Sequence, residues 1–303
     1  MHLFVRNFNI RILSLEDKKY LFSNRGIFLF DIKSDTSQLK TNAPSILADP
    51  FLFVYNDELF LFYEHQDKWI GGKGRICMRK TKDLKTWDEE VTVLEEPFHL
   101  SFPNVFEENG HVYMLPETGG GLSISLYEAV DKTLTRWKLK KKLIEDTNPW
   151  YDSTILKKDD KYYLFTGRDN DIEQEQYLFV ADDLLGPYLE HPCSPIAKGR
   201  DRGRNAGSII RNDNSLYRPV QVCLNSYGEQ TSIMKIEKIT PKDYQEVLFS
   251  KNIYDTTIPG YEEGGHQYNI AKFKGHYIVS TDYRVKNYNV VELYRKIKNK
   301  LLK

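Results

Sequence analysis

Apolar runs separated by short polar turns recur along this chain at a nearly constant interval. Five segments share a first apolar run, a turn rich in Asn, Asp and Gly, and a second apolar run that opens ten positions after a reference residue. The reference residues are Asp49, Phe102, Asp152, Ala206 and His266. Because Asn, Asp and Gly tolerate the positive φ of tight turns, each segment is predicted to form an antiparallel hairpin.

The interval between the segments indicates how the hairpins are arranged. Successive reference residues lie 50 to 60 positions apart, a period typical of four-stranded propeller blades. Further strands are predicted after the first two hairpins, at 75–81, 87–94, 123–129 and 137–143. A β-sandwich of hairpins is the alternative, but a sandwich requires no fixed period. We therefore predict an all-β, five-bladed β-propeller, with residues 1–303 forming a single domain whose blades start near 49, 102, 152, 206 and 266.

The fifth segment is too short to build a blade by itself. Residues 1–47 contain further strand-like runs at 3–8 and 27–32. We expect this N-terminal stretch to supply the outer strands of the last blade, because a closed ring leaves no exposed sheet edge at its ends. Residues 290–303 are predicted to be a short basic helix or a frayed end.

Composition changes this interpretation only slightly. The 43 Lys and Arg residues balance 43 Asp and Glu residues, so no overall charge favours nucleic acid as a partner. Three cysteines at unrelated spacings are typical of reduced thiols in a cytosolic protein. No apolar stretch approaches the roughly 20 residues that span a bilayer, and the N-terminus lacks the pattern of a secretory signal. A cytoplasmic location and no transmembrane segment are therefore expected.

A propeller would bring the reference residues together. The first strand of each blade lines the central channel, so Asp49, Asp152 and His266 should converge on the axis. A buried carboxylate is costly unless it is paired or functional, which favours a site at this position. The alternative interpretation is that each aspartate only caps a turn above its strand.

A second ring lies fifteen positions after each reference residue. It consists of Glu64, Glu117, Gly167, Gln221 and Thr281. These positions end the second strands, which return toward the face where the first strands begin. Beside them stand His65, Arg168 and Asp282, and Arg218 precedes Gln221 by three residues. Glu64, His65, Arg168, Arg218 and Gln221 are predicted to bind substrate, although strand-end residues of this kind are often only solvated.

A basic run at residues 198–205 enters the fourth blade. Its arginines, among them Arg202 and Arg204, could clamp phosphate or carboxylate, because guanidinium groups bind both in a bidentate manner. An ordinary solvated loop is the alternative. The run lacks the aromatic platforms of a nucleic-acid site. Trp69 and Trp150 are candidates for stacking on sugar rings.

Short motifs add a resemblance to known propellers. They are Ala48-Asp49-Pro50-Phe51, Tyr151-Asp152-Ser153 and Gly264-Gly265-His266, with the runs 82–87 and 183–188 on outer strands. Together they resemble the five-bladed propellers of glycoside hydrolase family 43 and of the invertase–levansucrase enzymes. Residues 102–105, 116–118 and 217–221 are more narrowly similar to the propeller domain of glucosamine inositolphosphorylceramide transferases and related bacterial polysaccharide-biosynthesis proteins.

The resemblance implies roles for several residues. It makes Asp49 the general base or nucleophile and Asp152 a stabiliser of the transition state. It also lets His266 help to hold a central metal ion such as calcium, although no cofactor is required. The family's general acid, however, is replaced in blade four by Asn205-Ala206-Gly207-Ser208.

Glycoside cleavage normally needs one group that protonates the leaving oxygen and another that attacks or activates water. Glu117, or less favourably Glu263, could replace the missing acid. Alternatively, the substrate carries a leaving group such as phosphate, whose charge the arginine loop would neutralise.

Three functional hypotheses follow. The first is a carbohydrate-active enzyme, a glycoside hydrolase or glycosyltransferase, that acts at a glycosidic bond of an anionic or phosphate-linked glycan. The second is a non-catalytic propeller that binds glycans or serves as a scaffold in polysaccharide biosynthesis. A protein-interaction propeller is weaker, because such rings rarely concentrate carboxylates on their axis. The sugar, the linkage and the oligomeric state stay open at this point.

Overall fold

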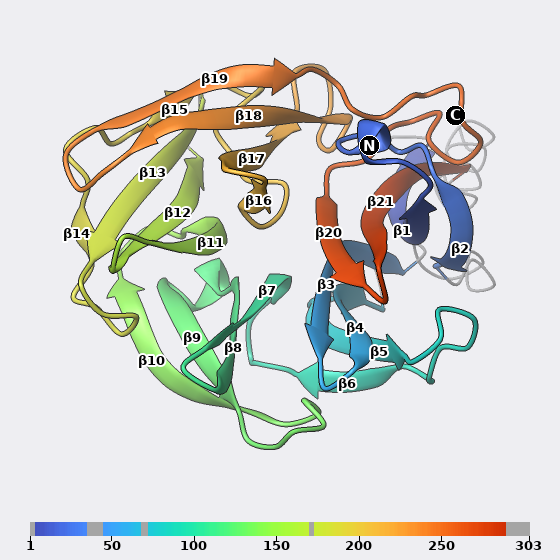
Figure 1. Cartoon of the computed structure of the whole chain (residues 1–303), viewed down its shortest axis with the longest axis horizontal. Coiled ribbons are helices and arrows are strands. Elements are labelled where there is room, and N and C mark those ends of the chain that lie inside the picture. Colours follow the sequence, from blue (N-terminus) through green and yellow to red (C-terminus); the bar gives the residue numbers. More distant parts are fainter. Residues whose placement is uncertain (1–3, 35–44, 68–71, 170–172, 289–303) are drawn as a thin grey trace, which may run out of the picture.

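The computed structural model describes residues 4–34, 45–67, 72–169 and 173–288, which form five antiparallel sheets around a central axis (Figure 1). Blade one consists of β3 (Ile46–Tyr55), β4 (Glu58–Gln66), β5 (Arg75–Thr81) and β6 (Val91–Leu94). Blade two consists of β7 (Ser101–Glu108), β8 (His111–Glu117), β9 (Ser123–Ala129) and β10 (Trp137–Glu145). Blade three consists of β11 (Tyr151–Lys158), β12 (Lys161–Asp169) and β13 (Gln174–Ala181), with the short strands β14 (Leu189–Glu190) and β15 (Ala197–Lys198) both paired to β13. Blade four consists of β16 (Ile210–Asn212), β17 (Ser215–Val222), β18 (Gln230–Ile239) and β19 (Tyr244–Ser250).

The N-terminus and the C-terminal strands share the fifth blade. Its strand order is β2 (Ile27–Ile32), β1 (Phe4–Leu15), β21 (His276–Tyr288) and β20 (Tyr268–Phe273), with β20 innermost. The strand β1 pairs with β21 along its whole length, from Phe4 opposite Tyr288 to Leu15 opposite Tyr277. The predicted five-bladed propeller and its closure by N-terminal strands are therefore confirmed. The first strand is longer than the predicted run 3–8, and the tail 290–303 lies outside the described residues.

The hairpins follow the predicted spacing. The second strands β4, β8, β12, β17 and β21 each begin at the expected position or one residue before it. The turns that precede them hold residues with positive φ, including Asn56, Asn109, Asp159 and Asp213. These residue types reach the left-handed region at low cost, which is why the chain reverses at these points. The 3₁₀ helices are short, at Lys18–Tyr20 and Gly119–Gly121, and no helix in the described residues has the length and hydropathy of a membrane span.

The same irregularity recurs in the inner strands of the first three blades. Asp49, Phe102 and Asp152 all have positive φ, at 52°, 46° and 48°. At each of them the pairing with the next strand skips residues, for example between Ala48 and Phe51. A bulge of this kind bends the strand and redirects a side chain. It directs both aspartates into the polar centre, while the ring of Phe102 packs on Phe51 with their centroids 4.8 Å apart.

Apolar side chains fill the space between blades and leave the axis polar. One cluster joins blade one to blade two through residues such as Phe60, Phe62 and Met114. Another joins blade five to blade one through Ile10, Ile12 and Leu61. Alternate residues of each strand point to opposite faces of its sheet. The apolar clusters show that these faces pack against the neighbouring blades. This packing makes the ring rigid enough to hold side chains from distant segments at the centre.

Candidate functional site

A cavity of about 320 Å³ lies at the centre of the ring, a volume in the range of small-ligand sites. Strands and loops of blades one, two, four and five supply its walls. Its ionisable lining consists of Asp49, Glu64, His99, Glu117, Arg204, Tyr227, His266 and Arg284. Asp152 is almost completely buried and is bonded to Arg204, which itself lines the cavity. The structure thus brings together Asp49, Asp152, Glu117 and His266, which were predicted from positions far apart in the sequence.

A chain of contacts runs from Asp282 through His266 to Asp49. The Oδ1 atom of Asp282 accepts hydrogen bonds from the backbone N–H groups of His266, at 2.7 Å, and of Gln267, at 3.1 Å. Its Oδ2 atom lies 2.7 Å from Nδ1 of His266, and Nε2 of that ring lies 3.4 Å from Oδ1 of Asp49. Burial lowers the pKa of His266, but Asp282 and Asp49 outweigh this effect and the net shift is upward. Asp282 therefore orients the His266 ring toward Asp49.

Asp49 has the properties of a general base or nucleophile. Its Oδ2 accepts a hydrogen bond from the N–H of Phe102 at 3.2 Å, and its Oδ1 has no hydrogen-bond partner in the described residues. Burial raises the pKa of Asp49 to about 7; His266 opposes this shift, whereas Asp152 adds to it. A carboxyl group with a pKa near the working pH is suited to proton transfer.

Glu117 and Asp152 share one cation, Arg204. The Nε atom of Arg204 donates to Oδ2 of Asp152 at 2.5 Å, and one terminal nitrogen donates to Oε2 of Glu117 at 3.5 Å. Burial, together with the neighbouring Asp152, raises the pKa of Glu117 well above its usual range, although Arg204 opposes the shift. A buried carboxyl group with a raised pKa on the cavity wall has the properties expected of a general acid.

Two other predicted residues support this centre. Nε2 of Gln221 donates to Oδ2 of Asp152 at 2.8 Å and to the carbonyl of Asn205 at 3.0 Å, so Gln221 holds Asp152 and does not line the cavity. Glu64 does line it, with Oε1 3.4 Å from Nε2 of His99. Burial, reinforced by Asp49 and Glu117, raises the pKa of Glu64 well above the ordinary value.

His65 and Arg218 lie away from the cavity. His65 follows Glu64 on the same strand and therefore faces the opposite side, where its Nδ1 lies 2.8 Å from Oε1 of Glu90. Arg218 is fully buried and donates to Glu246 through Nε at 2.9 Å. This geometry does not support the predicted contact of His65 and Arg218 with substrate.

Three more predicted residues are bonded elsewhere. The guanidinium of Arg168 lies 3.7 Å from the ring centroid of Trp150 and donates to Asp146. Trp150 is 4% exposed and packs under this arginine, so its ring faces are not open to a sugar. Arg202 is on the surface, where its guanidinium donates to both oxygens of Asp201, at 3.1 and 2.8 Å. Of the arginines at 198–205, it is Arg204 that lines the central cavity.

Sequence reasoning missed several residues of the cavity. Tyr227 and Arg284 belong to no repeated position, and Asp282 was noted only as a neighbour of the second ring. Tyr227 is 49% exposed, with its ring centroid 5.2 Å from that of His266, and it offers an aromatic surface at the entrance. The feature of the sequence that could have pointed to Tyr227 is its place in the loop between β17 and β18. Trp69, the other predicted aromatic, lies outside the described residues.

A central metal ion was predicted at His266. Asp49, His266 and Asp282 place potential ligand atoms within 4.8 Å of one another. Calcium takes six to eight oxygen ligands, whereas this group offers two carboxylates and an imidazole nitrogen. The oxygens of Asp282 also already accept backbone hydrogen bonds. The residues therefore do not fit calcium, and no chemical step below depends on a metal.

Known proteins with this fold include many carbohydrate-active enzymes. A family 117 glycoside hydrolase of Zobellia galactanivorans matches with a TM-score of 0.55 and 14% identity, covering 92% of this chain and 90% of the enzyme. A glycoside hydrolase family 43 protein of Bacillus licheniformis matches with a TM-score of 0.53 and 19% identity, covering 70% of this chain and 44% of that protein. At such identities these likenesses show the shared fold.

Sequence similarity is more specific. Glucosamine inositolphosphorylceramide transferase 1 of Arabidopsis thaliana is 36% identical over 210 residues, which are 67% of this chain and 27% of the plant protein. The chain thus spans about a quarter of the length of this relative. Residues 32–274 match the family described as glucosamine inositolphosphorylceramide transferase 1, N-terminal. The resemblance predicted from short motifs is confirmed, and the chain belongs to this N-terminal family of the glucosamine inositolphosphorylceramide transferases.

Proposed function

We propose that this chain is a carbohydrate-active enzyme that acts at a glycosidic bond. The observation that carries the proposal is the pair Asp49 and Glu117, buried carboxyl groups from blades one and two that line one cavity and both have a raised pKa. Cleavage or transfer at a glycosidic carbon uses a pair of this kind, one as acid and one as base or nucleophile. Asp49 would attack the sugar carbon or activate a water, and Glu117 would protonate the leaving oxygen.

The surroundings of each carboxyl group fit its assigned step. When Glu117 gives its proton to the leaving oxygen it becomes negative, and Arg204 at 3.5 Å stabilises that charge. Asp152 remains paired to Arg204 and Gln221 and offers negative charge beside a positive sugar transition state. At Asp49, the N–H of Phe102 fixes one carboxylate oxygen, while the other lies 3.4 Å from Nε2 of His266 and makes no hydrogen bond within the described residues.

The substrate class is inferred from the relatives and from charge. The curated relatives are transferases of glucosamine inositolphosphorylceramide, so a glucosamine-containing glycan is the first ligand to test. Asp49, Glu64 and Glu117 face the cavity and offer hydrogen-bond partners to the hydroxyl and amino groups of an amino sugar. An anionic or phosphate-linked part of the glycan would have to bind nearer to the cations of the cavity, Arg204 and Arg284.

The test uses Asp49→Asn and Glu117→Gln with p-nitrophenyl glucosaminides of both anomers as substrates. Asp49→Asn should lose about 10²–10⁴-fold in kcat, whereas Glu117→Gln should lose less on these substrates than on unactivated glucosamine oligosaccharides, because p-nitrophenolate leaves without protonation. Calorimetry should show that glucosamine still binds to both variants. Glu107→Gln, on the exposed part of β7, is the matched control and should keep full activity. Wild-type protein that turns over neither anomer and none of the oligosaccharides described below would contradict an enzymatic role.

A second candidate function is glycan binding without catalysis. The observation in its favour is that the fourth blade opens with Asn205 and contributes Arg204, a cation, where related hydrolases are expected to have an acid. In that case the wild type would bind sugar without turnover, and Glu117→Gln would leave affinity unchanged because the neutral amide resembles a protonated carboxyl.

A further inference from the structure

We propose that a groove over blade four is a second subsite, which holds the sugar units next to the one in the central cavity. This inference rests on the proposed function, because it takes the central cavity as the place of the reacting sugar. The groove has a volume of about 560 Å³, larger than the central cavity. A catalytic centre for a single sugar would not need it.

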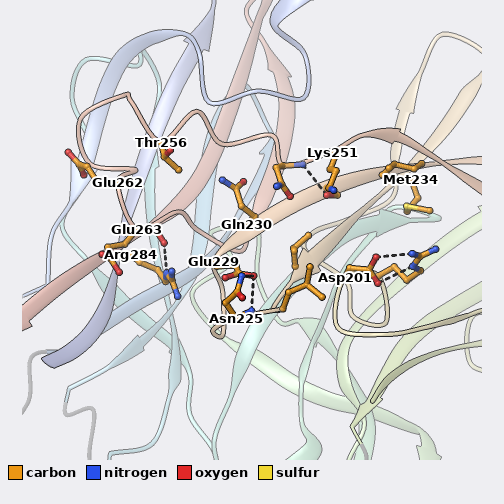
Figure 2. A pocket seen from close by; sticks show the side chains of 16 residues that line it. Asp201, Asn225, Glu229, Gln230, Met234, Lys251, Thr256, Glu262, Glu263 and Arg284 are labelled. Carbon is orange, nitrogen blue, oxygen red and sulfur yellow. Dashed lines mark hydrogen bonds and ion pairs between the residues drawn. The ribbon is translucent and has the colours of Figure 1, made fainter. Parts of the chain in front are cut away.

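The walls of the groove come from blade four and the loops around it. Strand β18 contributes Gln230 and Met234, β19 contributes Leu248, and the loop that follows β19 contributes Lys251 and Thr256. Figure 2 shows Arg284 and Glu263 at one end and Asp201 at the other, with Asn225 and Glu229 between them. The groove therefore extends outward along the blade from the loop that borders the central cavity.

One loop separates the two hollows and belongs to both. In the turn between β17 and β18, Ser226 and Tyr227 line the central cavity, whereas Leu224, Asn225 and Glu229 line the groove. Because the same short loop forms a wall of both hollows, a glycan whose reacting sugar lies in the central cavity would reach the groove by crossing this loop at Tyr227.

Arg284 marks the point where the two hollows meet, since it lines both of them. From β21 in blade five, its guanidinium donates to Oγ of Ser226 at 2.9 Å and to the carbonyl of Tyr227 at 2.6 Å. These bonds fix the loop in place, so the wall that the two hollows share is part of the folded structure.

The chemistry of the groove fits sugar units that carry no acidic group. Its ion pair Asp201–Arg202, at 2.8 Å, is satisfied internally, and Oε1 of Glu229 accepts from the backbone N–H of Asn225 at 3.0 Å. The acidic residues Asp201, Glu229, Glu262 and Glu263 outnumber the cations Arg202, Lys251 and Arg284, which disfavours phosphate. Between these polar groups lie Val222, Leu224, Met234 and Leu248, so hydroxyl edges and apolar ring faces both find partners.

Calorimetry with oligosaccharides of increasing length tests the subsite. The probes are glucosamine and the chitosan, N-acetylchito-, cello- and malto-oligosaccharides of two to four units. We expect at least one series to gain tenfold or more in affinity between one and three units. Leu248→Trp, which fills the groove, should abolish that gain without changing affinity for glucosamine. Gln245→Trp, on the same strand but outside the groove, is the matched control and should retain it.

The outcomes separate this inference from the proposed function. If glucosamine binds but no series gains affinity with length, or if Leu248→Trp retains the gain, the second subsite is overturned and the central site stands. If neither the monosaccharide nor any oligosaccharide binds, the proposed function and the subsite are both overturned. A drop in glucosamine affinity in Leu248→Trp would also overturn a separate subsite.

Discussion

The Nε atom of Arg204 donates a hydrogen bond to Oδ2 of Asp152 at 2.5 Å, although 52 residues separate the two in the chain. Asp152 begins blade three and Arg204 precedes blade four, so this bond links adjacent blades at the centre of the ring. The side chain of Arg204 is 11% exposed and that of Asp152 is 2% exposed. Both charges are therefore removed from water and depend on each other.

The first prediction concerns the stability of this buried pair. Arg204→Met should lower the free energy of unfolding by about 3–5 kcal/mol, because the carboxylates of Asp152 and Glu117 would lose their shared cation. Arg202→Met is the matched control from the same loop; its ion pair with Asp201 is exposed, and the change should be about 0–1 kcal/mol. Urea unfolding measures both values. Equal effects of the two substitutions would contradict the central role of Arg204.

The second prediction concerns the pH dependence of stability. Asp49 has a pKa of about 7 in the folded protein against 3.8 as its ordinary value, so the folded state binds its proton more tightly. The free energy of unfolding should therefore fall as pH rises from about 4 to about 7, by up to about 4 kcal/mol from this group, and should level off above that range. Asp49→Asn removes this contribution.

The measurement is a series of urea unfolding curves between pH 4 and 8 for the wild type and Asp49→Asn. The difference between the two curves reports Asp49 together with its effect on Glu64 and Glu117, because the charge of Asp49 raises the pKa of both. The exposed substitution Glu107→Gln should leave the pH profile unchanged. A parallel pair of wild-type and Asp49→Asn profiles would show that Asp49 keeps its ordinary pKa.

The third prediction tests how Asp282 acts on His266. The Asp282 carboxylate is the main group that opposes the effect of burial on this ring. Asp282→Asn should therefore lower the pKa of His266 and raise the population of neutral imidazole at pH 6 to 7. Two-dimensional NMR of the histidine side chains reads out the titration, with the signals of the other six histidines as internal controls. An unchanged His266 titration would mean that the two side chains are not coupled.

The fourth prediction concerns calcium. A ligand that binds the folded state stabilises it in proportion to the logarithm of its concentration over Kd. Because the set Asp49, His266 and Asp282 does not fit calcium, added calcium and added EDTA should both leave the unfolding temperature unchanged. Differential scanning fluorimetry over calcium concentrations from micromolar to millimolar checks this. A calcium-dependent rise that disappears in His266→Ala would show that the predicted metal site exists.

Much of the central site could be predicted because residues that recur at a fixed interval in a propeller sequence come together around its axis. Asp49, Asp152 and His266 occupy equivalent positions in different blades, and Glu64 and Glu117 end the strands that return to the same face. Backbone hydrogen bonding decides those positions, and the hairpin turns that set its register have a clear sequence signature.

Several side chains lie on the predicted strand or loop but point in a direction other than the predicted one. Glu64 and His65 are adjacent, but one lines the cavity and the other contacts Glu90. Arg202 and Arg204 belong to one basic run, yet the first faces solvent and the second faces Asp152. Alternation along a strand decides the first case, in which a shift of one residue reverses the result, whereas the conformation of the loop decides the second.

Strand period, turn chemistry and the positions on the axis were thus readable from the chain alone, because they depend on contacts close in sequence and on a repeat. The partners of each charge were decided only by tertiary structure. Arg204 became the central cation, Arg218 became a buried partner of Glu246, and Arg284 joined two hollows. The reason is physical: desolvation makes each buried charge depend on whichever opposite charge the neighbouring blade brings near, and no local pattern encodes that neighbour.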